Sequence, residues 1–318
     1  MKAIVQNAYG GPEVLKLAEV DKPDIKENEV LIRVHASAIN AGDYFSMRGS
    51  PWLARFSVGF PRPRNYILGW DAAGIVESVG REVKQLKAGD DVYGTCSHTF
   101  AEYTAVDEKH IAPKPSNLNF EQAAAVPSAA LTALQELREI GNMQAGHQVL
   151  INGASGGVGT FAVQIAKALG AEVTGVCSTR NVDMVKSIGA DHVVDYTKED
   201  FSQSGEQYDL ILDNVGNRSF SDCRRVLKPD GLMIPNTGHA GMGYVIKAAF
   251  RSLFMKQQGG MRMTQSNYAD LMFLKDLIES GKVKPVIDRT CNLEEIPEAM
   301  GYAEQGHVRG KVVITVYS

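Results

Sequence analysis

Short runs of apolar and β-branched residues, bounded by Gly, Pro, Asp and Asn, recur through the first third of the chain. Such runs are typical of strands, and few helical patterns separate them. The predicted strands are Ala3–Val5, Glu29–His35, Ala73–Val79, Val92–Tyr93 and Phe100–Val106. Residues 1–124 are therefore predicted to form a mostly β unit.

The pattern changes near residue 120, where apolar residues begin to recur at helical spacing. Helices are predicted at Phe120–Val126 and Ala129–Ile140. Strands and helices then alternate, which predicts a parallel, doubly wound sheet and an α/β fold class. The strands are Val149–Asn152, Glu172–Val176, His192–Val194, Leu210–Asp213 and Leu232–Ile234, and the helices are Val158–Leu169, Val182–Ile188 and Ser219–Leu227.

The last part of the chain is less regular. Thr237–Ser266 is rich in Gly, Met and Lys and has mixed periodicity, which predicts a loop and an irregular helix. A clearer helix is predicted at Tyr268–Ser280, where Gly281 is suited to end it. A last helix at Leu293–Glu304 and a closing strand at Lys311–Val316 follow.

Composition and charge narrow the class of protein. A chain of 318 residues, 44% of them hydrophobic, is longer than one ordinary domain needs, so two domains are expected. The formal net charge of −4 does not favour binding to nucleic acid or to an anionic membrane, both of which attract positively charged proteins. No apolar run reaches the roughly 18–20 residues of a spanning helix. The start MKAIVQNAYG also lacks the features of a signal peptide.

The cysteines are widely spaced and form no CxxC pair. This pattern favours free thiols in a reducing compartment over disulfides or a metal cluster. The four residues are Cys96, Cys177, Cys223 and Cys291. We therefore expect a cytoplasmic protein that binds neither nucleic acid nor membrane.

The most informative segment is VLINGASGGVGTFAVQIAKALG, at Val149–Gly170. A β-rich run enters a glycine-dense turn, and an amphipathic helix leaves it near Val158. Glycines let the backbone approach a pyrophosphate, and the helix start presents free N–H groups and a positive dipole end to that anion. This context predicts a dinucleotide site rather than a tight turn without a ligand. The turn residues are Gly153, Ala154, Ser155, Gly156, Gly157, Val158 and Gly159.

The end of the next strand bears on the choice of cofactor. An NAD-selective site usually has Asp or Glu there to bind the ribose 2′-hydroxyl, but the chain continues from Val176 as Cys-Ser-Thr-Arg. Ser178 can donate one hydrogen bond, and Arg180 can pair with a phosphate. Tyr196 adds a hydroxyl after the third strand. These residues favour NADPH, although Arg180 as a solvated residue at a helix start is the alternative.

At this point the chain resembles the medium-chain dehydrogenase/reductase superfamily, in its quinone oxidoreductase (zeta-crystallin-like) branch. The most specific match is Gly146-His147-x2-Leu150-x3-Ala154-Ser155-Gly156-Gly157-x-Gly159-x4-Gln164-x2-Lys167. Supporting segments are the opening MKAIV, Gly10–Leu15, Glu29–Asn40, Leu68–Val76, Ala124–Leu134 and Arg309–Ile314. The resemblance therefore covers essentially the whole chain.

The resemblance implies an architecture. A GroES-like β domain is formed by residues 1–124 and completed by residues 263–318, and a Rossmann domain spans residues 125–262. The active site is expected in the cleft, outside the carboxyl ends of the parallel strands. Members of this family are commonly homodimers, which makes a homodimer the expected state.

The resemblance also addresses zinc. Zinc-dependent members bind catalytic zinc through a Cys and a His, and the matching positions here hold Asn40 and Trp70. Neither side chain is a normal zinc ligand. Of the four structural cysteines of such members, only Cys96 lies in the corresponding neighbourhood. The remaining candidates, His35, His98 and His110, lack ligand spacing, so no metal is expected.

Without a Lewis acid, an alcohol is a poor substrate, whereas an enone or quinone gives a delocalised anion on hydride addition. The resemblance implies that the loop Asn40–Tyr44 faces the nicotinamide. Asn40 would donate an amide N–H to the substrate oxygen, and Tyr44 would donate its hydroxyl or stack on a ring. Asp43 would orient its neighbours or the nicotinamide ribose rather than act as an acid. The alternatives are ordinary turn chemistry for Asn40 and Asp43, and plain cleft lining for Tyr44.

Further cofactor contacts are implied by the resemblance. Thr132 would place a hydroxyl against the cofactor, unless it bonds its own helical turn. Lys311 matches the terminal cofactor contact of the family, unless it is a solvated lysine at a strand start. The other residues in this set are Asn214, Val215, Gly216, Gly238, His239 and Gly310.

An aromatic-rich stretch with interleaved arginines is the least standard part of the chain. Either it rims an apolar substrate pocket or it is a packed loop with solvated arginines. Its residues are Trp52, Phe56, Phe60, Tyr66 and Trp70, with Arg48, Arg55, Arg62 and Arg64.

Together these observations predict an NADPH-dependent, zinc-free oxidoreductase that transfers hydride to a small activated acceptor, either a quinone or an α,β-unsaturated carbonyl compound. A zinc-independent alcohol or aldehyde oxidoreductase is one alternative. A non-catalytic NADPH-binding sensor or partner protein is another, since cofactor binding does not prove turnover. Enoyl reduction on a carrier-bound chain is a third.

Overall fold

The computed structural model describes residues 1–52, 55–64, 66–237, 247, 250–252, 255–260 and 264–317. The chain divides into two compact units. Unit 1 comprises Met1–Leu131, Gln265–Ser280 and Pro285–Ser318, and unit 2 comprises Thr132–Thr264 and Gly281–Lys284. The limits predicted at residues 124 and 263 differ from these, because helix α4 (Pro127–Gln135) begins in unit 1 and ends in unit 2.

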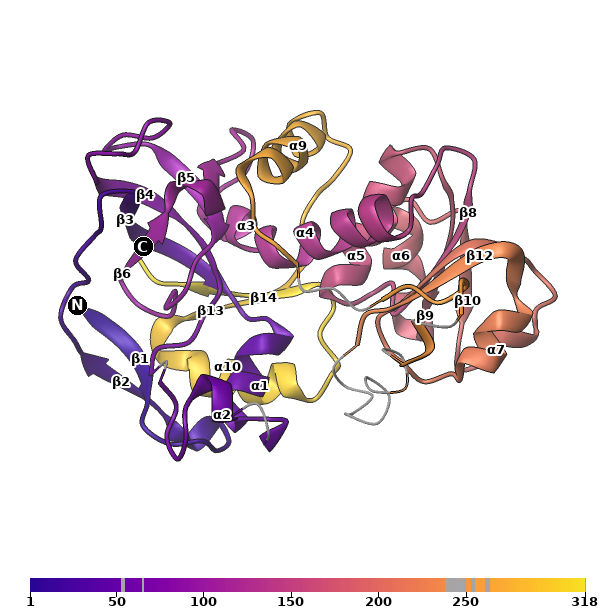
Figure 1. Cartoon of the computed structure of the whole chain (residues 1–318), viewed down its shortest axis with the longest axis horizontal. Coiled ribbons are helices and arrows are strands. Elements are labelled where there is room, and N and C mark those ends of the chain that lie inside the picture. Colours follow the sequence, from indigo (N-terminus) through magenta and orange to yellow (C-terminus); the bar gives the residue numbers. More distant parts are fainter. Residues whose placement is uncertain are drawn as a thin grey trace. The chain divides into compact units, whose positions relative to one another are not determined.

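Unit 1 is built on a seven-stranded sheet whose centre is the antiparallel pair β3 (Glu29–Ala38) and β4 (Asp71–Val79) (Figure 1). Its strand order is β13-β14-β3-β4-β5-β7, and β6 pairs with β3. The other bounds are β5 Asp91–Thr95, β6 Tyr103–Asp107, β7 Ile111–Pro113, β13 Ile287–Asn292 and β14 Lys311–Thr315. A separate hairpin pairs β1 (Lys2–Gln6) with β2 (Leu15–Glu19).

The helices of unit 1 are short and cover its core. They are α1 Ala41–Arg48, α2 Arg55–Val58, α3 Phe120–Ala124, α9 Tyr268–Glu279 and α10 Ile296–Glu304, with single turns η1 Pro12–Val14, η3 Glu108–His110 and η7 Leu293–Glu295. α1 and α10 contribute Met47 and Met300 to one apolar cluster, which also holds Ile4, Leu68 and Phe100. Burial of these side chains fixes the segments on either side of Asn40 and Trp70.

Unit 2 is a five-stranded, all-parallel sheet of order β10-β9-β8-β11-β12. Its strands are β8 Gln148–Asn152, β9 Glu172–Cys177, β10 His192–Asp195, β11 Tyr208–Asp213 and β12 Leu227–Pro235. Helices α5 (Gly157–Ala168) and α6 (Val182–Ser187) pack on β8–β10, and α7 (Phe220–Arg225) packs on β12. Single turns η5 (Thr179–Asn181) and η6 (Phe201–Gln203) complete it. The predicted α/β class and parallel sheet are confirmed.

The strand order of unit 2 locates a binding edge. From β8 the chain proceeds to β9 and β10 on one side, and then returns to β11 and β12 on the other. A parallel sheet binds ligands at such a reversal, outside the carboxyl ends of the strands. In unit 2 this point lies after Asn152 and Asp213, the last residues of β8 and β11.

The sequence prediction was wrong at one functionally important place. Residues 40–44 were expected to be a loop, but Asn40 is the N-cap of α1. Its backbone N–H donates to the Asp43 carboxylate at 2.8 Å, which closes the first turn. Asn and Asp serve both turns and helix caps, so their presence alone did not distinguish the two.

Two further differences are local. The strands β2, β7 and β13 were not predicted. β7 is only three residues long, and β2 and β13 show no clear alternation of buried and exposed positions. The segment Thr237–Ser266, expected to be irregular, lies largely outside the described residues. Among the residues that are described, no helix is both long enough and apolar enough to cross a bilayer.

A buried carboxyl group lies in unit 2, on the π-helical turn η4 (Glu136–Ile140) that follows α4. Glu136 is 5% exposed, and its Oε2 has no hydrogen-bond partner within the described part of the chain. Burial raises the pKa of Glu136 to about 8, from an ordinary value of 4.5. The folded state therefore binds this proton more tightly than the unfolded state does.

We expect the free energy of unfolding to fall as the pH rises from about 4.5 to about 8, because in that interval the unfolded chain releases the Glu136 proton first. Glu136→Gln should remove this loss and stabilise the protein by on the order of 3 kcal/mol at about pH 9. Urea unfolding across this pH range, with the exposed Glu206→Gln as a matched control, measures the effect. An unchanged pH profile in Glu136→Gln would contradict the assignment.

Candidate active site

Two buried carboxylates and one buried ammonium share a hydrogen-bond network in unit 1. The Asp71 and Lys311 side chains are 0% and 4% exposed, and Asp43 is also 0% exposed. β4 begins at Asp71 and β14 begins at Lys311, on the two sides of β3. Because Ala38 at the end of β3 lies opposite Asp71, the sheet brings both groups to Asn40.

Lys311 is fully engaged inside this network. Its Nζ donates to Asn40 Oδ1 at 2.5 Å and to the Ile39 carbonyl at 3.1 Å, and it lies 3.5 Å from Asp71 Oδ2. An ammonium has three N–H donors, and each has an oxygen partner here. Lys311 is therefore a buried counter-ion and not a solvated lysine, and its expected contact with the cofactor stays a prediction. Gly310 before it has φ +74°, and a Cβ there would lie 2.1 Å from the Val286 carbonyl, so Gly310 has a backbone role in unit 1.

Asp71 connects the network to the start of α4. Its Oδ2 accepts from Asn40 Nδ2 at 2.9 Å. Its Oδ1 accepts from the Ser128 backbone N–H at 2.9 Å and from the Ser128 hydroxyl at 2.5 Å. A buried carboxylate with this many donors is held in one orientation. Neither Asp71 nor Ser128 was singled out from the sequence.

The expected role of Asn40 is also corrected. Both amide hydrogens are already used, one by the Ala38 carbonyl at 3.2 Å and one by Asp71. The amide oxygen accepts from Lys311. Asn40 therefore has no N–H left for a substrate oxygen in this arrangement, and it acts as a positioning residue for the start of α1.

Asp43 orients backbone on both sides of the site. Its Oδ2 accepts from the Asn40 N–H at 2.8 Å, and its Oδ1 accepts from the Gly69 N–H at 3.0 Å. Burial raises the pKa of Asp43 to about 7 and the charge of Asp71 adds to this, although both N–H bonds and Lys311 oppose it. The carboxyl group joins α1 to the segment that precedes Trp70, which is the orienting role suggested for it.

Tyr44 lies in the core. It is 7% exposed and belongs to the apolar cluster of Met47, Leu68 and Phe100. Its ring centroid lies 5.1 Å from that of Phe45. Burial raises the pKa of its hydroxyl. Tyr44 therefore packs in the core of unit 1, and its expected contribution to a substrate site stays a prediction.

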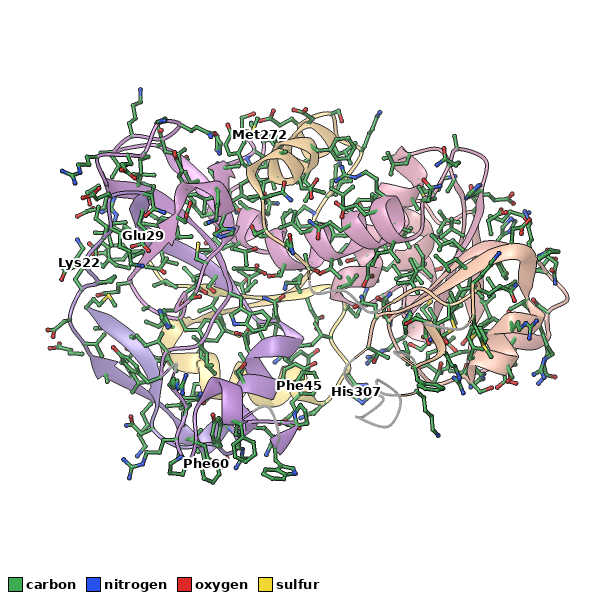
Figure 2. All side chains as sticks on the ribbon, viewed as in Figure 1. Lys22, Glu29, Phe45, Phe60, Met272 and His307 are labelled. Carbon is green, nitrogen blue, oxygen red and sulfur yellow. The ribbon has the colours of Figure 1, made fainter. Side chains whose placement is uncertain are left out.

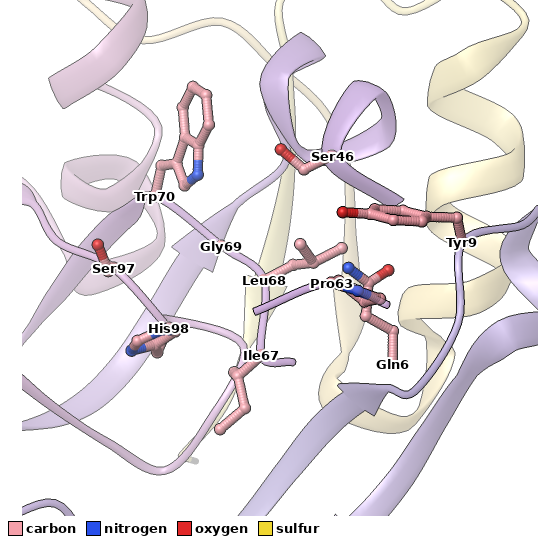
Figure 3. A pocket seen from close by; sticks show the side chains of 10 residues that line it. All are labelled: Gln6, Tyr9, Ser46, Pro63, Ile67, Leu68, Gly69, Trp70, Ser97 and His98. Atoms are coloured by element: carbon pink, nitrogen blue, oxygen red, sulfur yellow. The ribbon is translucent and has the colours of Figure 1, made fainter. Parts of the chain in front are cut away.

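A pocket of about 130 Å³ opens in unit 1 beside this network (Figure 3). Asn40, Asp43 and Tyr44 are not among its ten described lining residues. Those residues are Gln6, Tyr9, Ser46, Pro63, Ile67, Leu68, Gly69, Trp70, Ser97 and His98. The sequence missed this site except for Trp70, because its walls come from segments that are far apart in the chain.

Among the described aromatic residues of the stretch from Trp52 to Trp70, only Trp70 lines this pocket. Trp52, Phe56 and Phe60 are 59%, 61% and 64% exposed, and they pack on one another with centroids 5.5 Å apart. Phe60 projects outward from unit 1 (Figure 2). The structure thus separates Trp70 from the exposed aromatic residues that precede it.

In unit 2 the glycine-dense turn has the geometry of a dinucleotide site. α5 begins at Gly157, and no side chain caps its N-terminus at Gly156. The first N–H groups of the helix are thus free of side-chain caps and suited to an anion. A Cβ on Gly159 would lie 2.1 Å from the Gly153 carbonyl, so glycine is required where turn and helix meet. Ala154 is buried, whereas Ser155 and Val158 are partly exposed around the turn.

The loop after β11 is organised by Asp213, which the sequence analysis did not single out. Its Oδ1 accepts from the N–H groups of Val215 and Gly216, at 3.2 and 2.9 Å, and from Asn152 Nδ2 at 2.8 Å. Asn214 donates to the Asn152 carbonyl at 3.1 Å. The loop of Asn214 and Val215 is therefore fixed to the end of β8, beside the glycine turn. The sequence did hold one signal for this role of Asp213, namely an acidic residue at the end of a predicted strand.

The residues expected to contact the 2′-phosphate of NADPH lie at and near the end of β9. Ser178 and Ser155 both accept from Asn181 Nδ2, at 3.3 and 3.0 Å. Arg180 is exposed on η5, and Tyr196 is 52% exposed after β10. These groups surround an edge that is open to solvent and rich in hydrogen-bond donors.

One acid, Asp195, lies near this edge. It accepts from the Thr179 hydroxyl at 2.6 Å and the Thr197 hydroxyl at 2.7 Å, and it pairs with Lys198 at 3.1 Å. The hydroxyl donors and Lys198 lower the pKa of Asp195, so it is a charged but fully engaged carboxylate. Both oxygens of its carboxylate therefore have partners within unit 2.

Three expected cofactor contacts remain. The Thr132 hydroxyl lies 2.7 Å from that of Thr264, which places it within unit 2. Gly238 and His239 lie outside the described residues, so their roles stay predictions.

The residues at the expected zinc positions do not fit a metal. Asn40 is engaged with Lys311 and Asp71, and the Trp70 indole has no lone pair suited to zinc. In the described part of the chain, no group of three or more His, Cys, Asp or Glu side chains has a metal-binding arrangement. The dinucleotide, in contrast, fits the turn of unit 2.

Comparison with known proteins gives consistent matches along the chain. The family model described as alcohol dehydrogenase GroES-like domain matches residues 26–116, and the one described as zinc-binding dehydrogenase matches residues 188–314. The 2-methylene-furan-3-one reductase of Solanum lycopersicum is 38% identical, over 99% of this chain and 79% of that protein. The chloroplastic NADPH-dependent alkenal/one oxidoreductase of Arabidopsis thaliana is 37% identical with the same coverage.

A solved structure matches the same length of chain. The quinone oxidoreductase from Coxiella burnetii is 34% identical and superposes with a TM-score of 0.87, covering 99% of both chains.

Proposed function

This chain belongs to the medium-chain dehydrogenase/reductase superfamily, in its quinone oxidoreductase branch, and on that premise we propose that it is an NADPH-dependent, zinc-independent reductase of small enones or quinones. The names of the similar proteins share one chemical feature. A methylene-furanone, an alkenal and a quinone each carry a carbonyl conjugated to a carbon–carbon double bond. Hydride addition to such an acceptor gives a delocalised enolate or hydroquinone anion.

One observation carries the zinc-independent part of the proposal. The two positions that hold zinc ligands in zinc-dependent members are occupied by a fully hydrogen-bonded amide, Asn40, and by the indole of Trp70. The family model named for zinc-binding dehydrogenases matches residues 188–314, outside both positions. A delocalised anion needs less electrostatic help than the alkoxide of an alcohol, so hydrogen-bond donors suffice.

NADPH, when bound, supplies the hydride. The residues of unit 2 that would hold it are the turn Gly153–Gly159, the loop Asn214–Val215 and the end of β9 with Ser178, Arg180 and Tyr196. Arg180 matches the planar shape and charge of a 2′-phosphate. Its exposed position and the engagement of the neighbouring Asp195 support NADPH over NADH.

In unit 1 the residues orient rather than react. Lys311 and Asp71 hold Asn40, and Asp43 ties Asn40 to Gly69, which lines the pocket. A bound nicotinamide would supply the hydride to the acceptor, and solvent would supply the proton. Preorganised donors and exclusion of bulk water are the catalytic contributions of this chain. A homodimer and a cytoplasmic location, both expected from the sequence, are part of the same proposal.

Removal of metal tests the zinc-independent part. Protein treated with a chelator, with its metal content checked by elemental analysis, should oxidise NADPH with a small quinone as fast as untreated protein does. The reason is that Asn40 and Trp70 offer zinc no ligand pair. A loss of activity that added zinc restores would overturn this part of the proposal.

A further inference from the structure

The pocket of unit 1 has the size of one small ring. Its volume is about 130 Å³, whereas an apolar cavity of roughly 150 Å³ accepts a benzene molecule. Its walls come from the end of β1, from α1, from the segment before β4 and from the residues after β5 (Figure 3). Because the pocket is partly open to solvent, a single ring with small substituents or a short chain fits it, whereas a three-ring acceptor is too large.

The lining is uncharged. Ile67, Leu68 and Pro63 supply apolar surface, and the polar residues are neutral hydroxyls, an amide and His98. Burial lowers the pKa of His98 below its ordinary value of 6.5, so this ring is neutral at pH 7. None of the ten described lining residues therefore offers a positive charge to a carboxylate or phosphate. The pocket selects a neutral ligand.

Trp70 forms a rigid aromatic wall. Its indole rests on α1 so closely that a Cβ on Gly42 would lie 2.1 Å from its Cη2 atom. Its carbonyl accepts from the Cys96 N–H at 2.8 Å, and the preceding Gly69 N–H donates to Asp43. The residue as a whole is still 38% exposed. A fixed and partly open aromatic face stacks on a flat ligand with little loss of conformational entropy.

Hydrogen-bond donors accompany this wall. The Ser46 hydroxyl is turned toward the side of the pocket on which Trp70 lies (Figure 3). It has no hydrogen-bond partner among the described residues, and the indole N–H is a further donor. A hydroxyl in this position can donate to a carbonyl oxygen that gains negative charge.

We propose that this pocket is the acceptor site, that it takes a neutral, single-ring or similarly small conjugated carbonyl compound, and that Trp70 is its specificity-determining wall. The proposal rests on the proposed function for the reaction itself. Trp70 stands where zinc-dependent members have a zinc-binding His, and we assign it a different role, as the surface on which the acceptor stacks.

Binding is tested by fluorescence, without NADPH. The chain has two tryptophans, so Trp52→Phe leaves Trp70 as the reporter and Trp70→Phe leaves Trp52. Tetramethyl-1,4-benzoquinone is the probe, because its ring has no free position for thiol addition. We expect saturable quenching in Trp52→Phe and a linear, collisional response in Trp70→Phe, after correction for quinone absorbance with N-acetyltryptophanamide. A linear response in both variants would overturn the proposal.

Specificity is tested by kinetics. Trp70→Ala should raise the KM for this quinone roughly tenfold and leave the KM for NADPH unchanged, since it removes a stacking face and apolar contact area. It should also improve the relative rate with a three-ring quinone. Trp70→Phe should recover most of the affinity, and Trp52→Ala should behave as wild type. An unchanged quinone KM in Trp70→Ala would overturn the proposal.

The outcomes separate the two levels of inference. Saturable quenching of Trp70 without turnover supports the pocket and removes the proposed function. Turnover with the same quinone KM in wild type and in Trp70→Ala supports the proposed function and contradicts the assignment of the pocket. Absence of both binding and turnover removes both.

Discussion

Replacing Lys311 with methionine is expected to lower the free energy of unfolding by about 3–5 kcal/mol. Lys311 is the ammonium that lies between Asn40, the Ile39 carbonyl and Asp71, and its side chain is 4% exposed. Methionine keeps most of the volume but leaves Asp71, which is 0% exposed, without this counter-ion. Removing one partner of a buried ion pair leaves an uncompensated charge that water does not reach.

Urea unfolding measures the effect, and an exposed pair supplies the control. Lys22 pairs with Glu77 in the same unit, and both side chains are 40% exposed. Lys22→Met should cost less than about 1 kcal/mol. Adding Asp71→Asn to Lys311→Met should recover part of the loss, because it removes the stranded charge. Equal effects of Lys311→Met and Lys22→Met would mean that the buried network does not hold unit 1 together.

The second large effect concerns the cofactor. Arg180→Ala should lower kcat/KM for NADPH by about 10–100-fold, because a charge-assisted hydrogen bond contributes roughly 1.5–3 kcal/mol. With NADH, which lacks the 2′-phosphate, the same variant should show little change. Arg180 is exposed on η5, so its replacement should not disturb the core of unit 2.

Initial rates with both cofactors test this expectation. Arg225→Ala removes another exposed arginine of unit 2, one that pairs with Asp222, and should leave the NADPH-to-NADH ratio as in wild type. A loss of the same size with both cofactors would assign Arg180 a structural role. No loss with either cofactor would remove it from the site.

The parts of the fold that the sequence predicted are those with local periodic patterns. The strands and helices of unit 2 alternate along the chain, so the parallel sheet followed from hydrophobic spacing alone. α1 was missed because Asn40 and Asp43 are as typical of a turn as of a helix cap. In this case the tertiary contacts of Met47 and Tyr44 with the core decide in favour of the helix.

The residues of the candidate site likewise fall into those that a local pattern predicted and those that only distant contacts bring together. The glycine turn was visible because all of its functional groups lie within one short segment. The Lys311–Asp71 pair joins residues 240 positions apart, and no local pattern reports such a contact. For the same reason Asn40 was expected to be a free donor, whereas its hydrogen bonds are completed by partners from β4 and β14.

The central claim is NADPH-dependent reduction of a conjugated carbonyl acceptor without metal. The decisive measurement is the loss of NADPH absorbance in metal-depleted protein with a small quinone, an alkenal, a cyclic enone and a saturated aldehyde, with NADH alongside. We expect fast oxidation of NADPH with the conjugated acceptors, little with the saturated aldehyde and little with NADH. Activity confined to the saturated aldehyde, or appearing only after zinc is added, would contradict the account.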